Sequence, residues 1–247
     1  MSIKTTLNYS PNFNPIKRKP KDIKFIIFHY TGMKKESAAI KRLTNIQSEV
    51  GCHYLIRNNG EITTMVPDLY EAWHAGKSSW KKYKSLNKNS IGIEISNPGH
   101  DFGYRDFSDK QIISILRLSK FLIKKYSVQS KNILGHSDIA VDRKKDPGEK
   151  FPWKYLALNK IGIWHKLANK ILKQSRMTKI DKKSKESFLK NLLRIGYSKR
   201  NINILNQKKY LIFVTKAFQR RFRQDLINGK IDKECLLISK NLVKKFN

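Results

Sequence analysis

The sequence lacks the features that define membrane proteins and disulfide-rich proteins. Its 247 residues include two cysteines, Cys52 and Cys235, which are too few and too far apart for a disulfide framework or a zinc finger. No apolar run is long enough to span a membrane, and residues 1–21 have neither the apolar core nor the cleavage pattern of a classical secretion signal. We therefore expect two buried or unpaired thiols and no transmembrane segment.

Acidic residues are also scarce. The chain has 19 Asp and Glu against 52 Lys and Arg, a formal net charge of +33. Such a charge attracts nucleic acid, anionic lipid or an anionic cell-wall polymer. The lysines are scattered, however, and accompany many isoleucines and asparagines, so the compositional bias of an A/T-rich genome explains the charge equally well. Specific nucleic-acid binding rests on charge alone, because no basic block interleaved with aromatic residues is present.

Strand and helix patterns alternate in the first part of the chain, which favours an α/β domain. Strand patterns lie at residues 24–30, 61–66 and 90–96, and a helical pattern lies at residues 109–126. Ser108 or Asp109 is a plausible cap for this helix. An aromatic and then helical stretch at residues 151–173 closes the domain, which we assign to residues 1–173 with an N-terminal extension at residues 1–21.

A second, smaller domain is predicted at the C-terminus. Residues 174–185 are polar and basic with almost no apolar anchors, as in an interdomain linker. Beyond them, residues 186–247 contain three stretches with helical apolar spacing, at residues 187–195, 210–222 and 232–246. A three-helix unit of this size can fold alone, although only marginally.

Residues that could bind a metal occur at three places. His29 ends the apolar strand that begins at residue 24, and a Thr-Gly turn signal follows it. His136 precedes Asp146 by ten residues, and Asp146 is followed by Pro-Gly. A lone histidine is more often structural, but these ligand types could converge at one sheet edge. Two imidazoles and one carboxylate leave one zinc position open, as in catalytic sites.

Two charged residues could complete such a site. Glu94 alternates with isoleucines at residues 90–95, so its side chain points away from theirs. This is an ordinary solvent-facing position unless that face is the cleft, where Glu94 could take a proton from the attacking water. Lys144 is one of many lysines, but it could stabilise the oxyanion that forms when water attacks a carbonyl. The spacing thus favours a metal-dependent hydrolase.

Short segments in a characteristic order extend this interpretation. They are Phe-His-Tyr-Thr at residues 28–31, Cys-His-Tyr-Leu-Ile at 52–56, Trp-His-Ala-Gly at 73–76, Asn-Ser-Ile-Gly-Ile-Glu at 89–94, and Gly-His-Ser-Asp-Ile-Ala to Asp-Pro-Gly at 135–148. The chain from about residue 9 to residue 164 resembles the type 2 zinc N-acetylmuramoyl-L-alanine amidases, most closely the AmpD/AmiD branch. This family is related to the peptidoglycan recognition proteins and to a bacteriophage lysozyme. The resemblance implies a mixed central sheet flanked by helices.

The resemblance also implies the reaction and the roles of the residues. The bond cleaved is the amide between the lactyl group of N-acetylmuramic acid, or its 1,6-anhydro form, and L-alanine of a peptidoglycan stem peptide. His29, His136 and Asp146 match the ligands of one zinc ion per chain. Glu94 matches the general base, and Lys144 matches the cation that stabilises the tetrahedral intermediate.

Further residues are expected to contact substrate. His53, Trp73 and His74 fall in motifs that line the cleft in this family, although a structural hydrogen-bonding role for His53 is an equal alternative. Arg143, beside Lys144, could hold a stem-peptide carboxylate through its guanidinium.

The C-terminal unit resembles a three-helix peptidoglycan-binding domain. The matching parts are Ala-Phe-Gln-Arg-Arg-Phe at residues 217–222 and Gly-Lys-Ile-Asp at residues 229–232. Tethering an amidase to the wall would raise the local substrate concentration. A generic helical appendage is the alternative.

A non-catalytic peptidoglycan-recognition protein is the main rival to the amidase. It is disfavoured because every ligand position is filled. The expected partners are peptidoglycan or muropeptides. A wall-binding unit favours the cell envelope or periplasm, whereas the missing signal favours the cytoplasm, where recycling amidases act; we expect the envelope.

Overall fold

The computed structural model describes residues 3–198 and 207–245. The elements along the chain are β1 Thr6–Leu7, β2 Phe13–Asn14, β3 Phe25–Tyr30, α1 Glu36–Thr44, β4 Tyr54–Ile56, β5 Ile62–Thr64, β6 Glu71–Ala72, β7 Ser79–Trp80, β8 Tyr83–Lys84, β9 Ser90–Ile95, α2 Asp109–Tyr126, β10 Ile133–Gly135, α3 His136–Ile139, α4 Trp153–Leu158, α5 Asn169–Ser175, α6 Lys182–Ile195, α7 Gln207–Phe222 and α8 Lys233–Val243.

The central sheet is mixed, which confirms the predicted fold class. Its strands lie in the order β1-β5-β4-β9-β3-β10, and every neighbouring pair is parallel except β4 with β5. Because β3, β9 and β10 are parallel neighbours, their carboxyl ends meet at one edge of the sheet. Within this register His29 of β3 lies opposite Glu94 of β9. The topology thereby brings distant segments of the chain to one edge.

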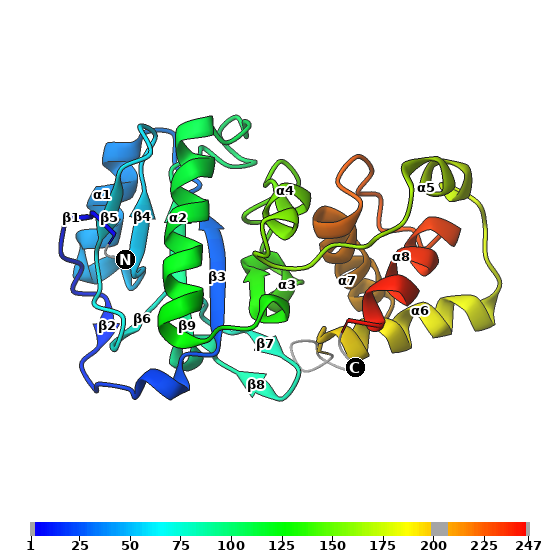
Figure 1. The fold of residues 1–247 in the computed structure, drawn as a ribbon, viewed down its shortest axis with the longest axis horizontal. Coiled ribbons are helices and arrows are strands. Elements are labelled where there is room, and N and C mark those ends of the chain that lie inside the picture. The colour runs from blue at the N-terminus through cyan, green and yellow to red at the C-terminus, as the bar shows by residue number, and fades with distance from the viewer. Residues whose placement is uncertain (1–2, 199–206, 246–247) are drawn as a thin grey trace.

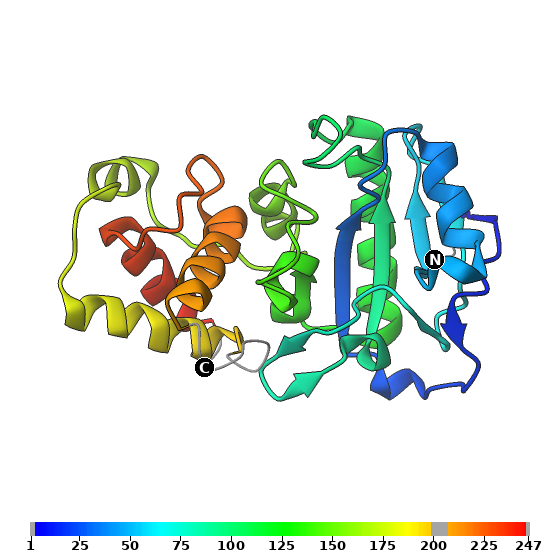
Figure 2. The same cartoon turned by 180° about the vertical axis from the view of Figure 1, so that it is seen from behind.

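Helix α2 covers one face of this sheet, as Figure 1 shows, and Figure 2 shows the strands from the opposite side. The Ser108 side chain accepts a hydrogen bond from the Gln111 N–H, which confirms the predicted cap. The core beneath the helix includes Ile91, Ile93, Ile115, Leu118 and Leu122. Since side chains alternate along a strand, Ser90, Gly92 and Glu94 face the other side of β9.

The C-terminal helices α6, α7 and α8 pack beyond the β10 end of the sheet (Figures 1 and 2). Phe188 of α6 and Phe218 of α7 belong to the same buried apolar cluster as Phe25 and Ile27 of β3. This shared core means that the C-terminal helices pack against the sheet and are not a separate unit joined to it only by a linker.

A buried polar contact reinforces this docking. The Asp138 carboxylate in α3 accepts a hydrogen bond from the Tyr197 hydroxyl at 2.8 Å and forms an ion pair with Arg221 of α7. Arg221 also donates to the backbone oxygen of Ile133 at 2.8 Å. Removing one partner of a buried ion pair is strongly destabilising. The C-terminal helices are therefore locked to the segment that begins with His136.

The segment expected to be a linker is partly helical. Helix α5 ends at Ser175 and α6 begins at Lys182, so ordered helix enters the range 174–185 from both sides. The Asp181 carboxylate caps α6 by accepting a hydrogen bond from the Ser184 N–H at 2.7 Å. The Asp181 cap thus lets α6 begin at Lys182, several residues before the apolar stretch that predicted this helix.

The two ends of the chain also differ from expectation. Within the predicted N-terminal extension, β1 pairs with β5 and so joins the sheet. Helix α8 ends at Val243, and residue 246, the predicted end of this helix, lies outside the described residues. Cys52 and Cys235 are buried and unpaired, as expected.

Candidate metal centre and active site

The candidate site lies at the carboxyl edge of β3, β9 and β10. His29 and Glu94 are each the second-last residue of their strand, and His136 follows β10 as the first residue of α3. Asp146 enters from the loop after α3, where its backbone oxygen accepts a hydrogen bond from the Ser137 N–H at 2.8 Å. The structure thus brings the three predicted ligands together.

The ligand atoms of these residues form a small buried triangle. The Nδ1 atoms of His29 and His136 lie 3.0 Å apart, and each lies 3.0 Å from Oδ2 of Asp146. The corners of such a triangle are about 1.7 Å from its centre, so all three atoms would be within the usual zinc–ligand distance of about 2.0–2.1 Å of one ion. All three side chains are buried, and their donor set of two imidazoles and one carboxylate suits zinc.

The protonation states of these groups also suit a metal. Burial, reinforced by His136, lowers the pKa of His29 to about 4, so this ring is neutral at pH 7. Burial acts to raise the pKa of Asp146, but His136 and His29 outweigh it and hold that pKa well below its usual range. A neutral imidazole and an ionised carboxylate are the forms that bind metal.

Glu94 lies beside this triangle in an unusual environment. Its side chain is buried, and Oε2 has no hydrogen-bond partner among residues 3–198 and 207–245. Burial raises its pKa well above the ordinary value, and the Asp146 carboxylate adds to the shift. The Lys144 ammonium opposes that shift and also acts on His29, so it lies within electrostatic range of both. A carboxyl group with a raised pKa suits proton transfer near neutral pH.

His53 is fully buried and bonded to the backbone through both ring nitrogens. Nδ1 accepts a hydrogen bond from the Gly92 N–H at 2.9 Å, and Nε2 lies 2.9 Å from both the Tyr70 oxygen and Arg18 Nη2. Burial, with a smaller contribution from Arg18, lowers its pKa to about 3. These contacts favour the structural role of His53 over contact with substrate.

Trp73 and His74 lie on one turn beside the ligands. Trp73 is half-buried, whereas His74 is buried with its Nδ1 atom 3.0 Å from Nε2 of His29. His74 therefore contacts a predicted ligand directly.

Arg143 approaches the same turn from the other side. Its Nη2 atom donates to the backbone oxygens of Ala75 at 2.6 Å and Lys77 at 2.7 Å. The guanidinium thus binds the turn itself, and its contact with a stem-peptide carboxylate stays a prediction.

Two polar residues of the site escaped the sequence analysis. Ser90 Oγ lies 3.1 Å from Nε2 of His74, and Asn87 Oδ1 accepts a hydrogen bond from the Ala75 N–H at 2.6 Å. The signal for Ser90 was the pattern of small residues, Ser90 and Gly92, between the isoleucines of β9. Small side chains there leave room for the His74 ring.

A buried ligand triangle beside a carboxyl group of raised pKa is typical of a metal-dependent hydrolase. Comparison with known families makes the class specific: the family model described as N-acetylmuramoyl-L-alanine amidase matches residues 19–149, more than half of the chain. The chain belongs to this amidase family.

Individual relatives extend the similarity beyond the amidase segment. The chain is 35% identical over 240 residues to N-acetylmuramoyl-L-alanine amidase AmiD of Escherichia coli, covering 91% of this chain and 83% of AmiD. A structure of AmiD with the substrate anhydro-N-acetylmuramic acid-L-Ala-D-gamma-Glu-L-Lys superposes with a TM-score of 0.78 at 32% identity, covering 94% of this chain and 92% of that one. AmpDh3 of Pseudomonas aeruginosa in complex with anhydromuramic pentapeptide gives 0.79 at 30% identity, covering 99% and 96%.

These similarities confirm the predicted amidase activity and the AmpD/AmiD branch. In the described part of the chain, no helix is long and apolar enough to cross a membrane.

Proposed function

We propose that this amidase binds one zinc ion per chain and cleaves muramyl peptides, including 1,6-anhydro forms. The observation that carries the proposal is the buried 3.0 Å triangle of His29 Nδ1, His136 Nδ1 and Asp146 Oδ2. The substrates named in the AmiD and AmpDh3 complexes support the choice of anhydromuramyl peptides.

The residues of the site divide the chemistry among them. When bound, zinc would polarise the scissile carbonyl and lower the pKa of a water molecule. Glu94 takes a proton from the water molecule while the water oxygen attacks the lactyl carbonyl carbon. Glu94 then returns this proton to the L-alanine nitrogen as the C–N bond breaks. Lys144 stabilises the negative charge on the carbonyl oxygen in between. The products are a muramyl carboxylate and a stem peptide with a free amine.

Zinc content and mass-spectrometric products test this proposal. Purified protein is incubated with anhydromuropeptides, other soluble muropeptides and intact sacculi, with and without a chelator. One zinc per chain and chelator-sensitive release of free stem peptide are expected. Zinc-loaded protein that binds these substrates without cleaving them would instead be a recognition protein.

We further propose that the C-terminal helices bind peptidoglycan in the cell envelope. Two residues of the predicted motif support this, because Gln219 Oε1 accepts a hydrogen bond from the Gly229 N–H at 2.8 Å and so fixes the turn between α7 and α8. The formal charge of +33 also favours attraction to an anionic polymer.

A sedimentation experiment tests this proposal. The Glu94→Gln variant should sediment with sacculi, and this binding should persist when salt is added. Binding that is abolished by moderate salt would reduce the interaction to charge alone. Cell fractionation tests the compartment.

A further inference from the structure

One turn of the chain contacts both histidines of the candidate metal centre. We name residues 74–77 the orienting turn. Resting on the metal site proposed above, we propose that the orienting turn fixes the tautomers of His29 and His136, so that both present an unprotonated Nδ1 to the ion. His74 and the backbone oxygen of Ala75 are the groups that act on the two rings.

The tautomer of His29 follows from a chain of hydrogen bonds that can run in one direction. The Ser90 hydroxyl donates to the Leu86 oxygen at 2.6 Å, so its oxygen is left to accept from His74 Nε2 at 3.1 Å. A neutral His74 ring that donates from Nε2 must accept at Nδ1. His29 Nε2, 3.0 Å away, therefore carries the proton that His74 accepts. The His29 Nδ1 atom keeps its lone pair for a metal.

The tautomer of His136 is set by a simpler contact. Its Nε2 atom lies 3.2 Å from the backbone oxygen of Ala75. A carbonyl oxygen can only accept, so Nε2 carries the proton and Nδ1 is unprotonated. Arg143 Nη2 lies 3.5 Å from the same Nε2 atom, but its two hydrogens go to the backbone oxygens of Ala75 and Lys77. The same carbonyl accepts from Arg143 at 2.6 Å, which holds it in place between the two side chains.

The orienting turn is itself held rigidly. Asn87 Oδ1 accepts hydrogen bonds from the N–H groups of His74 at 3.2 Å and Ala75 at 2.6 Å. Gly92 lies against the His74 ring so closely that a Cβ atom there would overlap with it. Gly76 has a φ of +53°, a conformation that glycine adopts readily. Fixed positions on each side leave the His74 ring little freedom to rotate.

The consequence for the site is a preformed pair of ligand atoms. A histidine protonated at Nδ1 would have to exchange its proton and break its outer hydrogen bond before binding. Outer partners that fix histidine ligands typically change metal affinity by about 10- to 100-fold when removed. His74, Ala75 and Arg143 are therefore positioning groups, and they need not touch the substrate.

The first test uses the unmodified protein without metal. Long-range proton–nitrogen NMR of ¹⁵N-histidine-labelled, chelator-treated protein at pH 7.5 reports which ring nitrogen carries the proton. His29 and His136 should both be protonated at Nε2. A ring that carries its proton on Nδ1 and none on Nε2 would overturn the proposal, and this result does not depend on how any variant folds.

The second test compares two replacements of His74. His74→Leu removes the acceptor, whereas His74→Asn places an amide oxygen close to the position of Nδ1. Zinc dissociation constants are measured by competition with a chromophoric chelator. We expect His74→Leu to bind zinc about 10- to 100-fold more weakly, and His74→Asn to recover most of this loss.

A matched control separates orientation from stability. His165 is also a buried histidine, but it lies with Trp164 and Phe222 beside α5 and α8 and contacts none of the predicted metal ligands. His165→Asn should keep the zinc affinity even if the melting temperature falls. The inference fails if both His74 variants bind zinc like the unmodified protein, or if their affinities follow their melting temperatures alone.

These readouts keep the two proposals separate. Loss of zinc affinity in His74→Leu without any amide cleavage by the unmodified protein would support the orienting turn and reject the proposed substrate. Cleavage by the unmodified protein with unchanged zinc affinity in His74→Leu would support the substrate and reject the orienting turn.

Discussion

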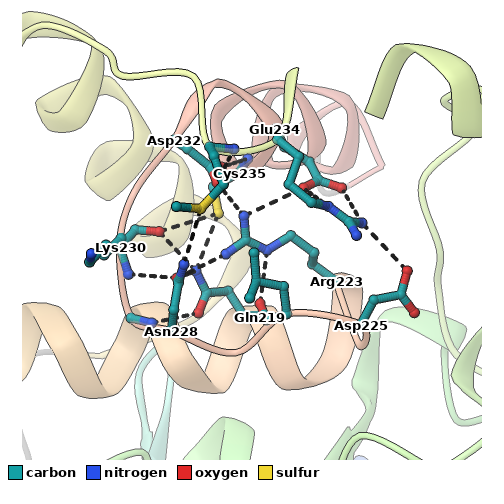
Figure 3. A network of polar contacts seen from close by, with 12 residues as sticks. Gln219, Arg223, Asp225, Asn228, Lys230, Asp232, Glu234 and Cys235 are labelled. Carbon is teal, nitrogen blue, oxygen red and sulfur yellow. Dashed lines mark hydrogen bonds and ion pairs between the residues drawn. The ribbon is translucent and has the colours of Figure 1, made fainter. Parts of the chain in front are cut away.

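Two buried polar clusters in this molecule differ in whether their donors and acceptors match. At the start of α8, the guanidinium of Arg223 forms an ion pair with Asp232 and donates to Asn228 Oδ1 at 3.1 Å and Glu234 Oε2 at 3.4 Å (Figure 3). Arg176 donates to the same Glu234 carboxylate at 2.8 Å and 2.9 Å. Positive donors meet negative acceptors throughout this Arg223 cluster, so it satisfies itself.

The ligand triangle has the opposite character. In the tautomers that the orienting turn favours, His29 Nδ1 and His136 Nδ1 are both acceptors, and the Asp146 carboxylate is a third. Acceptors 3.0 Å apart repel unless a proton or a metal ion lies among them. Self-matched polar groups thus mark a part of the fold that serves stability, whereas converging acceptors mark a place built for a cation.

The largest expected effect concerns a further acceptor, Glu94. Glu94→Gln keeps the shape of the side chain but removes its ability to take a proton. We expect kcat/KM to fall by about a hundredfold to ten-thousandfold, with zinc still bound. Steady-state kinetics on an anhydromuropeptide, together with metal analysis of the same preparation, would check this. Full activity would remove Glu94 from the mechanism.

A substitution in the Arg223 cluster should lower the stability of the protein and leave the metal site unchanged. Arg223→Met leaves the buried Asp232 carboxylate without its guanidinium partner, whereas Glu234 keeps Arg176, so the free energy of unfolding should fall by about 3–5 kcal/mol. Zinc affinity should not change. Urea unfolding and chelator competition measure the two quantities.

A control for this variant is available on the same network. Asp225 is an exposed partner of Arg176, at 3.5 Å with 76% of its side chain accessible. Asp225→Asn should cost less than about 1 kcal/mol, because exposed pairs contribute little. Equal losses in Arg223→Met and Asp225→Asn would contradict the importance of burial.

Acid should weaken the metal-free protein through its buried histidines. His29 and His53 have pKa values of about 4 and about 3 in the folded state, below the ordinary 6.5. The unfolded chain therefore binds more protons than the folded chain between these values, and stability is lost as the pH falls below about 6.5. Each such histidine contributes a slope of about 1.4 kcal/mol per pH unit.

Urea unfolding of chelator-treated protein at pH 7.5, 6.5 and 5.5 measures this slope. His53→Gln removes one titrating ring that is not a predicted metal ligand and should flatten the curve. The raised pKa of Glu94 gives a slope of the opposite sign, so the test is the difference between the two proteins. Equal slopes for the unmodified protein and His53→Gln would show that His53 is not buried in neutral form.

Several parts of the fold were predictable because their signals are local. Apolar spacing and the Ser108 cap predicted α2 with the observed bounds, and runs of β-branched residues predicted β3 and β9. The convergence of His29, His136 and Asp146 was also predictable, since these residues stand next to strand ends or turn signals that can be read along the chain.

Other parts depend on contacts between distant residues. The three-residue strand β4 and the helix α1 are too short for a clear period, and they form because the sheet supports them. The docking of Arg221 on Asp138 joins residues 83 positions apart. Similarly, nothing in the local sequence places the Ala75 carbonyl beside Arg143. The hydrogen bonds around a site join residues that are distant in sequence, so they can be known only once the fold is known.

The smallest expected change in stability comes from making the same type of substitution, Asp to Asn, in each of the two clusters. The two variants should have opposite consequences for zinc affinity and for the free energy of unfolding. Asp146→Asn should abolish tight zinc binding, yet the metal-free variant should lose less free energy of unfolding than Asp232→Asn, since the new amide can donate to a histidine Nδ1. Asp232→Asn can still cap α8, but it removes the charge that matches Arg223 and should therefore destabilise the protein while sparing zinc affinity. Paired urea unfolding and zinc titration of these variants would check both halves. If Asp146→Asn proved the more destabilising in the absence of metal, the triangle would be a structural cluster like that of Arg223.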